Sequence, residues 1–577
     1  MGNAAPTYTV SDYILDRLKS LGLKHMFVVP GDYASFFLDT LDSDPDIERI
    51  ANINELGVGY AADGYGRFKG IAACSVQYGV GAFSILNCIA GAYVERVPMA
   101  LIGPSPSTKN RITTKTQGVL FHHSTGDLEA DQKVMENVTV ASIVVRDGAS
   151  APAQIDNALI AMITHRRPVY IEVLQDIFGA GCTCPIGVLK AEKQVSESKS
   201  LAAAVDAAWT LLEKAKLPLI WWGVEIQRYG LQALAQEMVD VSGIMFTTTS
   251  LGKTVLDESQ KQFVGTYAGP ASPALTRAVV AATDCVLALG TIITDDYLDI
   301  MNADYGKMIL STDEGTRVGY SEFQFVAMED FIAALLQRMR DSGKYPKRFA
   351  KPAYEASKTS RPLAVEGLTY DRFYSVMGEW LIGKGNIADA KLILGESTSL
   401  YVFGNLMGMP PDSFVAQAAW GSLGHETGCA LGIELATGQR PIVVAGDGGF
   451  MMICQEISSL VRQKSDAIVF VMSNGGYAIE QSFVDINAFT PQGEYAPFDI
   501  LPEWDYLALA KAFGAKGYVV ETVGQLRRLL QKLETKTGVP ALVQVKIPLK
   551  DLPLQLCRLA TPQPSLQDSG NCSVSEK

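Results

Sequence analysis

Two short polar motifs in the C-terminal third have residue types that could bind a metal ion and a diphosphate. Gly-Asp-Gly-Gly at 446–449 and Ser-Asn-Gly-Gly at 473–476 each follow a strand-sized apolar segment. If these segments are neighbouring parallel strands, Asp447 and Asn474 reach the same edge of one sheet. A carboxylate, an amide oxygen and backbone carbonyls are hard oxygen donors that suit Mg²⁺ or Ca²⁺. The glycines also let a diphosphate approach the backbone and a helix N-terminus closely.

A Gly-Asp-Gly alone also serves as an ordinary turn. The prediction therefore depends on the two motifs together, each placed at the end of a strand.

Candidate acid–base residues lie in the N-terminal third. Asp32 follows Pro-Gly at the end of an apolar segment, and Glu55 opens a stretch rich in small residues. His122 and His123 are two of only five histidines. Adjacent histidines point in different directions, so one metal site that uses both is not expected. The alternatives are a plain surface loop for the histidines and a helix-dipole role for Glu55.

The segments that must position these residues alternate between strand-sized apolar runs and helix-like stretches. This alternation predicts an α/β fold of three consecutive open domains with mostly parallel sheets. The short basic stretch 338–361 lacks interleaved aromatic residues at a stacking rhythm and is interpreted as a solvated linker. The predicted boundaries are an N-terminal domain 1–185, a central domain 198–345, a C-terminal domain 365–550 and a tail 551–577.

Composition restricts the class of protein. The 577 residues are 48% hydrophobic and 19% charged, against roughly 25% charged in an average soluble protein. Intrinsic disorder is excluded as the dominant state, because it requires low hydrophobicity and high net charge. A formal charge of −13 is a poor match to nucleic acid.

The sequence also bears on the cellular compartment of the protein. The first nine residues show no basic segment followed by an apolar core, and no apolar run is long enough to span a membrane. The nine cysteines are scattered, mostly within apolar segments. We therefore expect a cytoplasmic protein without membrane or nucleic-acid partners.

The order of motifs over almost the whole chain resembles that of thiamine diphosphate enzymes. Their cofactor signature is Gly-Asp-Gly followed further along by Asn. His122 and His123, with Gly-Tyr-x-Ile-Glu at 476–480, resemble the 2-oxo acid decarboxylase branch, which includes pyruvate, indolepyruvate and phenylpyruvate decarboxylases. Ser473 departs from the pattern, because the family usually has a first asparagine there. The motifs that carry the resemblance lie at 29–32, 54–56, 61–65, 121–123, 420–421, 446–448 and 476–480.

This resemblance implies thiamine diphosphate and Mg²⁺ as cofactors and a fold in which pyrimidine and diphosphate domains flank a central domain. Glu55 would activate the cofactor, and Leu423 would be the apolar wedge that bends it. The implied metal ligands are Asp447, Asn474 and Gly476. The implied catalytic residues are Asp32, Glu55, His122, His123 and Glu480. The implied cofactor-binding residues are Glu55, Ser397, Thr398, Ser399, Gly421, Leu423, Asp447, Gly448, Gly449, Asn474, Gly476, Tyr477 and Ile479.

The expected function is non-oxidative decarboxylation of a 2-oxo acid to an aldehyde and CO2 through a thiamine diphosphate enamine. Three bulky residues, Tyr401, Ile479 and Phe483, are expected to wall the substrate pocket and to favour pyruvate or another short aliphatic substrate. The alternatives are a phenylpyruvate or indolepyruvate decarboxylase, a carboligase that forms 2-hydroxy ketones, and a catalytically silent scaffold.

The resemblance also implies an oligomer. In the family, the pyrimidine domain of one chain faces the diphosphate domain of another, so Glu55 and Asp447 would serve one site from different subunits. A homodimer is then the minimum, and a homotetramer is expected.

Overall fold

The structure is a computed structural model that describes residues 8–354 and 361–560. Residue contacts divide it into two compact units. The first contains the described chain up to Lys193 together with Thr427–Gln439 and Ile453–Ser465, and the second contains Gln194–Glu426, Arg440–Met452 and the chain from Asp466 onward. Part of the predicted linker, 355–360, and the end of the predicted tail, 561–577, lie outside the described residues.

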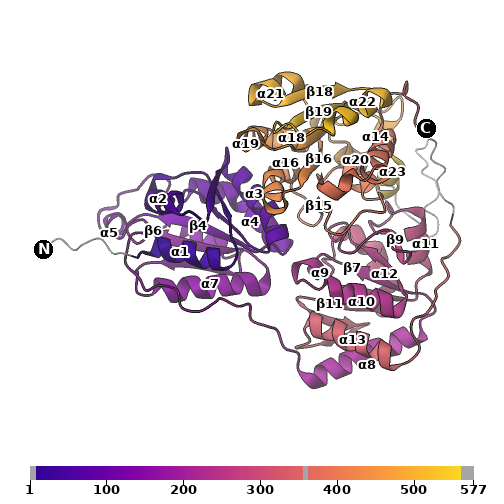
Figure 1. The fold of residues 1–577 in the computed structure, drawn as a ribbon, viewed down its shortest axis with the longest axis horizontal. Coiled ribbons are helices and arrows are strands. Elements are labelled where there is room, and N and C mark those ends of the chain that lie inside the picture. Colours follow the sequence, from indigo (N-terminus) through magenta and orange to yellow (C-terminus); the bar gives the residue numbers. More distant parts are fainter. Residues whose placement is uncertain (1–7, 355–360, 561–577) are drawn as a thin grey trace. The chain divides into compact units, whose positions relative to one another are not determined.

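The first unit contains a six-stranded parallel sheet in the order β2-β1-β3-β4-β6-β5. Helices pack against the strands of this sheet (Figure 1), and the inner strands are buried along their length, as expected for a parallel sheet. The strands are β1 (His25–Val28), β2 (Glu48–Ala51), β3 (Ala72–Ser75), β4 (Met99–Ser105), β5 (Ala141–Val145) and β6 (Val169–Leu174). The helices are α1 (Val10–Ser20), α2 (Ser35–Ser43), α3 (Glu55–Lys69), α4 (Val80–Val94), α5 (Thr108–Gln117), α6 (Ala130–Met135) and α7 (Ala151–His165).

Two helices from late in the chain, α17 (Ala430–Thr437) and α19 (Glu456–Arg462), belong to this first unit. Glycines let α17 approach α3 closely. A Cβ atom on Gly432 would lie 1.7 Å from the Ala61 carbonyl oxygen, and one on Gly64 would lie 2.4 Å from that of Cys429. The small residues after Glu55 therefore serve helix packing.

The second unit contains a seven-stranded sheet in the order β13-β12-β11-β10-β7-β8-β9. It is parallel except for β12 and β13, which pair antiparallel at one edge. The strands are β7 (Pro218–Trp222), β8 (Met245–Thr248), β9 (Phe263–Thr266), β10 (Cys285–Leu289), β11 (Met308–Thr312), β12 (Gly315–Val318) and β13 (Ser321–Phe323). The helices are α8 (Ser198–Lys214), α9 (Glu225–Arg228), α10 (Gln232–Ser242), α11 (Ala274–Ala282), α12 (Leu298–Asp304) and α13 (Met328–Asp341).

The second unit also contains a six-stranded parallel sheet in the order β15-β14-β16-β17-β19-β18. The strands are β14 (Ala390–Leu394), β15 (Phe414–Ala416), β16 (Arg440–Gly446), β17 (Ile468–Ser473), β18 (Lys516–Val520) and β19 (Ala541–Lys546). The helices are α14 (Tyr370–Gly378), α15 (Thr398–Phe403), α16 (His425–Gly428), α18 (Asp447–Ile453), α20 (Ala478–Val484), α21 (Tyr506–Phe513), α22 (Val523–Leu533) and α23 (Leu554–Ala560).

The prediction of three α/β domains with mostly parallel sheets is confirmed by these three sheets. Each sheet lies inside one predicted domain, while the residue boundaries stay a prediction. Residues 554–560, within the predicted tail, form α23, which buries Leu556 and Cys557 and packs against α15 and α20. Its proline, Pro553, stands just before the helix, a position that proline tolerates.

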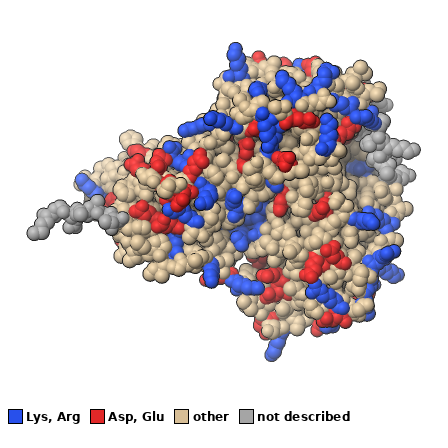
Figure 2. Space-filling view, viewed as in Figure 1, with Lys and Arg blue, Asp and Glu red and all other residues tan. Residues whose placement is uncertain are grey.

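The charge on the surface and the apolar length of the helices bear on nucleic-acid and membrane partners. Figure 2 shows Lys and Arg side chains interspersed with Asp and Glu on the visible face of each unit. No helix within residues 8–354 or 361–560 is long and apolar enough to cross a membrane.

Candidate active site

The carboxyl ends of β16 and β17 bring the two polar motifs together. These strands pair in parallel with Gly446 opposite Met472. The Asp447 carboxylate accepts the Gly475 N–H at 2.7 Å and the Gly448 N–H at 3.1 Å. The Asn474 side-chain oxygen accepts the Gly476 N–H at 3.4 Å. Asp447 and Asn474 therefore reach one sheet edge, as the sequence predicts.

Asp447 lies in an environment that favours a cation. Its side chain is buried, and burial raises its pKa to about 6, although the backbone N–H groups of Gly475 and Gly448 lower it. A buried carboxylate is costly unless a positive charge or a metal balances it. No cluster of three or more His, Cys, Asp and Glu side chains in the described ranges could hold a metal ion. A metal at Asp447 would therefore take amide and backbone oxygens as its other ligands.

Glycines shape this edge of the sheet. A Cβ atom on Gly448 would lie 2.2 Å from the Tyr477 ring, and Gly475 has φ +79°. A larger residue at either position would clash or be strained. The Tyr477 ring fills the space beside Gly448, whereas the space beside Gly475 is open, so a ligand could approach the backbone closely at Gly475.

The loop after β14 contributes the predicted serine and threonine residues. Ser397 caps α15, since its hydroxyl accepts the Ser399 N–H at 3.2 Å. A Cβ atom on Gly446 would lie 3.5 Å from the Ser397 Cβ, so this loop adjoins the Asp447 motif. Thr398 and Ser399 are buried, and among the described residues the Ser399 hydroxyl has no hydrogen-bond partner. Such a buried hydroxyl fits a phosphate oxygen of a bound ligand.

The loop after β15 holds Gly421 and Leu423. Gly421 has φ +67°, and Leu423 is half-buried. The Gln417 side-chain oxygen accepts the Ser422 N–H at 3.0 Å, which holds the loop. The Gln417 side-chain nitrogen is buried and has no partner within the described chain. This amide nitrogen is a second polar atom suited to a ligand.

Glu426 is a buried acid that the sequence analysis did not single out. A Cβ atom on Gly395 would lie 2.6 Å from the Glu426 carboxyl carbon, and one on Gly449 would lie 2.9 Å from Oε1. Glu426 thus adjoins the loop after β14 and the first turn of α18. Burial raises its pKa to about 7, although backbone N–H groups lower it. The signal in the sequence is an acidic residue inside the Gly-rich stretch 421–433.

The predicted residues of α20 differ in exposure. Gly476 and Ile500 form an isolated bridge beside this helix, and the Tyr477 N–H donates to the Asp499 carbonyl at 2.8 Å. Glu480 is exposed, and Phe483 is 56% exposed. Ile479 is partly buried against the core of the third sheet.

Tyr401 on α15 is buried, but its hydroxyl lies among carboxyl groups. The hydroxyl oxygen is 3.3 Å from Asp296 Oδ1 and 3.4 Å from Glu396 Oε1. Asp296 comes from the 3₁₀ helix η2 (Asp295–Tyr297), and burial raises its pKa. Sequence spacing gave no signal for Asp296, because it lies in the central domain, far from Tyr401 along the chain.

In the first unit, Asp32 and the two histidines gather around the loop that follows β3. The Gln77 side chain donates to Asp32 Oδ1 at 2.6 Å. The next residue, Tyr78, donates from its hydroxyl to the His122 carbonyl and places its ring edge-on to His123 at 5.8 Å. Asp32, His122 and His123 are exposed. The structure therefore brings Asp32 and the His122–His123 pair, which lies far along the chain from it, to the same loop.

Glu55 is the first residue of α3, and the preceding Asn54 caps the helix by accepting the Gly57 N–H at 2.8 Å. A second carboxyl lies close by, on Glu456 of α19. It accepts the Asn52 side-chain N–H at 2.9 Å, and a Cβ atom on Gly57 would lie 2.1 Å from it. Burial raises the pKa of Glu456. The sequence analysis missed Glu456, because α19 is distant in sequence from α3.

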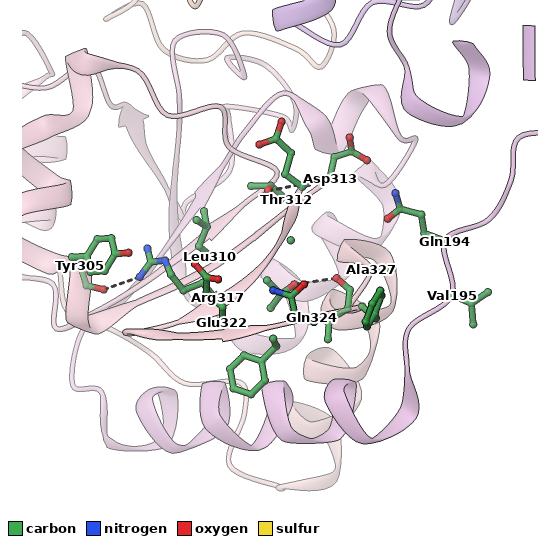
Figure 3. A pocket seen from close by; sticks show the side chains of 16 residues that line it. Gln194, Val195, Tyr305, Leu310, Thr312, Asp313, Arg317, Glu322, Gln324 and Ala327 are labelled. Atoms are coloured by element: carbon green, nitrogen blue, oxygen red, sulfur yellow. Dashed lines mark hydrogen bonds between the residues drawn. The ribbon is translucent and has the colours of Figure 1, made fainter. Parts of the chain in front are cut away.

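A separate hollow of about 670 Å³ lies in the central domain, beside β11, β12 and β13 (Figure 3). Its Arg317 donates to the Tyr305 carbonyl at 3.3 Å and stacks over the Tyr305 ring at 3.7 Å. The lining contains no residue predicted for the active site.

The fold and the grouped acids, glycines and hydroxyls define a cofactor-dependent α/β enzyme. Three family models match the chain. "Thiamine pyrophosphate enzyme, N-terminal TPP binding domain" matches residues 8–128, the "central domain" of the same enzymes matches 205–322, and the "C-terminal TPP binding domain" matches 398–545.

Curated relatives extend over nearly the full length of the chain. A probable pyruvate decarboxylase of Schizosaccharomyces pombe is 29% identical over 96% of each chain. An alpha-keto-acid decarboxylase of Mycolicibacterium paratuberculosis is 28% identical over 96% of this chain and 97% of its own. Pyruvate decarboxylase isozyme 1 of Saccharomyces cerevisiae is 27% identical over 96% and 98%. The chain belongs to the thiamine diphosphate-dependent 2-oxo acid decarboxylases and is a carbon–carbon lyase.

Proposed function

We propose that this lyase converts pyruvate or another short aliphatic 2-oxo acid to an aldehyde and CO2, with Mg²⁺ beside thiamine diphosphate. The proposed cofactor site rests mainly on one observation. The Gly475 N–H donates a hydrogen bond to the Asp447 carboxylate, which connects the ends of β16 and β17. The names of the relatives, among them pyruvate decarboxylases, support the reaction.

The residues at the third sheet fit the cofactor. Asp447, Asn474 and the Gly476 carbonyl would hold Mg²⁺, because hard oxygen donors suit that ion. Gly448 and Gly449, together with the hydroxyls of the loop after β14, would receive the diphosphate. Leu423, Tyr477 and Ile479 would contact the rings. When bound, the thiazolium supplies the electron sink that accepts the electron pair as CO2 departs.

Protons are moved by the chain's own residues. As the family resemblance implies, Glu55 would hold the proton that exchanges with the aminopyrimidine; it is the first residue of α3, directly after the capping residue Asn54. Asp32, His122, His123 and Glu480 would add a proton to the reacting carbon and take one from the hydroxyl of the product. Several groups with different pKa values in one pocket suit that pair of steps.

The assembly we propose is a homodimer at minimum and a homotetramer in its usual form, with Glu55 and Asp447 of different subunits serving one site. We also propose a cytoplasmic location.

The substrate preference is tested by comparing kcat/KM for pyruvate, branched-chain, phenyl and indolyl 2-oxo acids, with product analysis. We expect the highest value for a short aliphatic acid and an aldehyde as the main product. A higher value for phenylpyruvate would overturn the substrate assignment, and a 2-hydroxy ketone as the main product would establish a carboligase.

A further inference from the structure

Glu456 is a buried acid to which the proposed mechanism gives no role. It is the first residue of α19 and is 2% exposed. Although it lies 404 positions beyond Asn52 in the sequence, α19 belongs to the same compact unit as β2 and α3. The contacts of Glu456 with the segment that leads to Glu55 therefore lie within one unit.

The carboxyl group of Glu456 contacts the turn between β2 and α3. Its Oε2 accepts the Asn52 side-chain N–H at 2.9 Å. Burial raises the pKa of Glu456, whereas the Asn52 side chain lowers it, as do the backbone N–H groups of Ile53 and Asn54. The carboxyl group thus faces three consecutive residues, and the next residue along the chain is Glu55.

The same carboxyl group lies against the first turn of α3. A Cβ atom on Gly57 would lie 2.1 Å from Glu456 Oε1 and 2.3 Å from the carboxyl carbon, so a glycine is required to leave room for the acid. The Gly57 N–H donates to the Asn54 side chain at 2.8 Å. Glu456 therefore contacts the backbone on both sides of Glu55.

This arrangement is costly for the folded protein. Within the described residues, the buried atoms Glu456 Oε1 and Asn52 Oδ1 have no hydrogen-bond partner. A buried carboxyl group and buried acceptors without a donor both lower stability. Packing of α19 alone would be served better by an apolar side chain. The placement of the acid against this turn therefore points to a role beyond packing.

We propose that Glu456 is a positioning residue for Glu55, because its carboxyl group holds the turn 52–54 and the first turn of α3 in place. This inference rests on the proposed function, in which Glu55 exchanges a proton with the cofactor. A displacement of a reacting group by 1 Å can cost about 10²-fold in rate, so the rigidity of this turn matters for the exchange.

Glu456→Gln tests the proposal with little change in size. Glutamine has a single acceptor oxygen, and its NH2 group is a donor. The NH2 group must therefore face either the Asn52 side-chain N–H or the backbone N–H groups of the turn, donor against donor. The variant should loosen the turn without emptying the site.

The first measurement needs no cofactor. Backbone amide hydrogen exchange of the cofactor-free full chain, followed by mass spectrometry of the peptide with Gly57 and Val58, reports how firmly the first turn of α3 is held. The Val58 N–H donates to the Asn54 carbonyl at 3.0 Å. In E456Q these amides should exchange about threefold to tenfold faster, as for the loss of one hydrogen bond of ordinary strength. Unchanged amide exchange would overturn the proposal.

The second measurement separates positioning from cofactor binding. Hydrogen–deuterium exchange at the thiazolium C2 of the bound cofactor should slow at least about tenfold in E456Q, while the affinity for thiamine diphosphate stays that of the parent. In the double variant E55Q/E456Q, the rate should equal that of E55Q, because a residue that acts through Glu55 has nothing to position there. A parent-like C2 rate in E456Q, or a further slowing in the double variant, would overturn the proposal.

Ser458→Ala is the matched control. It removes a hydrogen bond of the same helix, from the Ser458 hydroxyl to the Gln455 carbonyl at 2.7 Å, and should leave both exchange rates unchanged. Changes in S458A equal to those in E456Q would show a general effect of α19 and would overturn the proposal.

If E456Q does not fold, Asn52→Ala provides the same test, because it removes the same hydrogen bond from the donor side. Unchanged amide and C2 exchange in N52A would likewise overturn the proposal. Absence of C2 exchange in the parent chain would contradict the proposed function. The amide exchange of the cofactor-free protein would still decide whether Glu456 holds the turn.

Discussion

The Asp447 carboxylate accepts the backbone N–H of Gly475 at 2.7 Å, which joins the ends of the adjacent parallel strands β16 and β17. The carboxylate is thereby held by backbone rather than by a flexible partner. It keeps lone pairs for a cation, because an ionised carboxylate can accept about four hydrogen bonds. This hydrogen bond between the two strand ends lies at the centre of the proposed cofactor site.

Replacing Asp447 by Ala should abolish activity and weaken binding of thiamine diphosphate with Mg²⁺, because the anchoring carboxylate is removed. Calorimetry of the cofactor and the metal measures this. Glu503→Gln, a change at an exposed acid of the same unit, should bind like the parent. Parent-like binding in D447A would refute the metal-ligand role.

Replacing Glu55 by Gln should leave the fold and most cofactor binding intact but slow proton exchange at the thiazolium C2. General acid–base groups contribute about 10²–10⁴-fold, so a loss of at least about 100-fold is expected. Hydrogen–deuterium exchange at C2 measures the rate. Exchange as fast as in the parent would show that another group activates the cofactor. The buried Glu456, whose carboxyl accepts the Asn52 side-chain N–H, would then be the candidate.

Glu426 should make the stability of the cofactor-free protein depend on pH. Its pKa is raised from 4.5 to about 7 in the folded state, so its favourable contribution is complete below pH 4.5 and is lost as pH rises through 7. Glu426→Gln should remove this dependence and stabilise the protein at pH 8 by up to about 3 kcal/mol. Thermal unfolding from pH 5 to pH 8 measures the difference. If the thermal stability of parent and variant declines equally as pH rises, the account of a buried Glu426 with a raised pKa is contradicted.

Shortening Phe483 to Ala should raise the relative kcat/KM for aryl 2-oxo acids, if this side chain walls the pocket. One methylene in an apolar pocket is worth about 1–3 kcal/mol, so a shift of about tenfold is expected. Tyr401→Phe tests Tyr401, another proposed wall residue of the substrate pocket. It removes the hydroxyl that lies near Asp296 and keeps the ring. An unchanged ratio of aryl to aliphatic rates in F483A would remove Phe483 from the pocket.

Much of the architecture could be predicted from the sequence, because strand-sized apolar runs alternate with amphipathic helices and because glycine-rich motifs mark strand ends. The joining of Asp447 and Asn474 followed from these two signals. The contacts of Glu426, Glu456 and Asp296 could not be predicted in this way. They depend on which helices and loops pack together over long sequence separations, and a single buried acid has no periodic signal. The helix α23 was missed, because prolines on either side of it resemble a tail.

The most direct test of the central claim is CO2 release from pyruvate by the purified full-length chain, after removal of bound cofactor and metal. The account predicts little release without additions, and stoichiometric acetaldehyde and CO2 after thiamine diphosphate and Mg²⁺ are restored together. Release that is independent of thiamine diphosphate, or no release from pyruvate or any other 2-oxo acid in its presence, would contradict it.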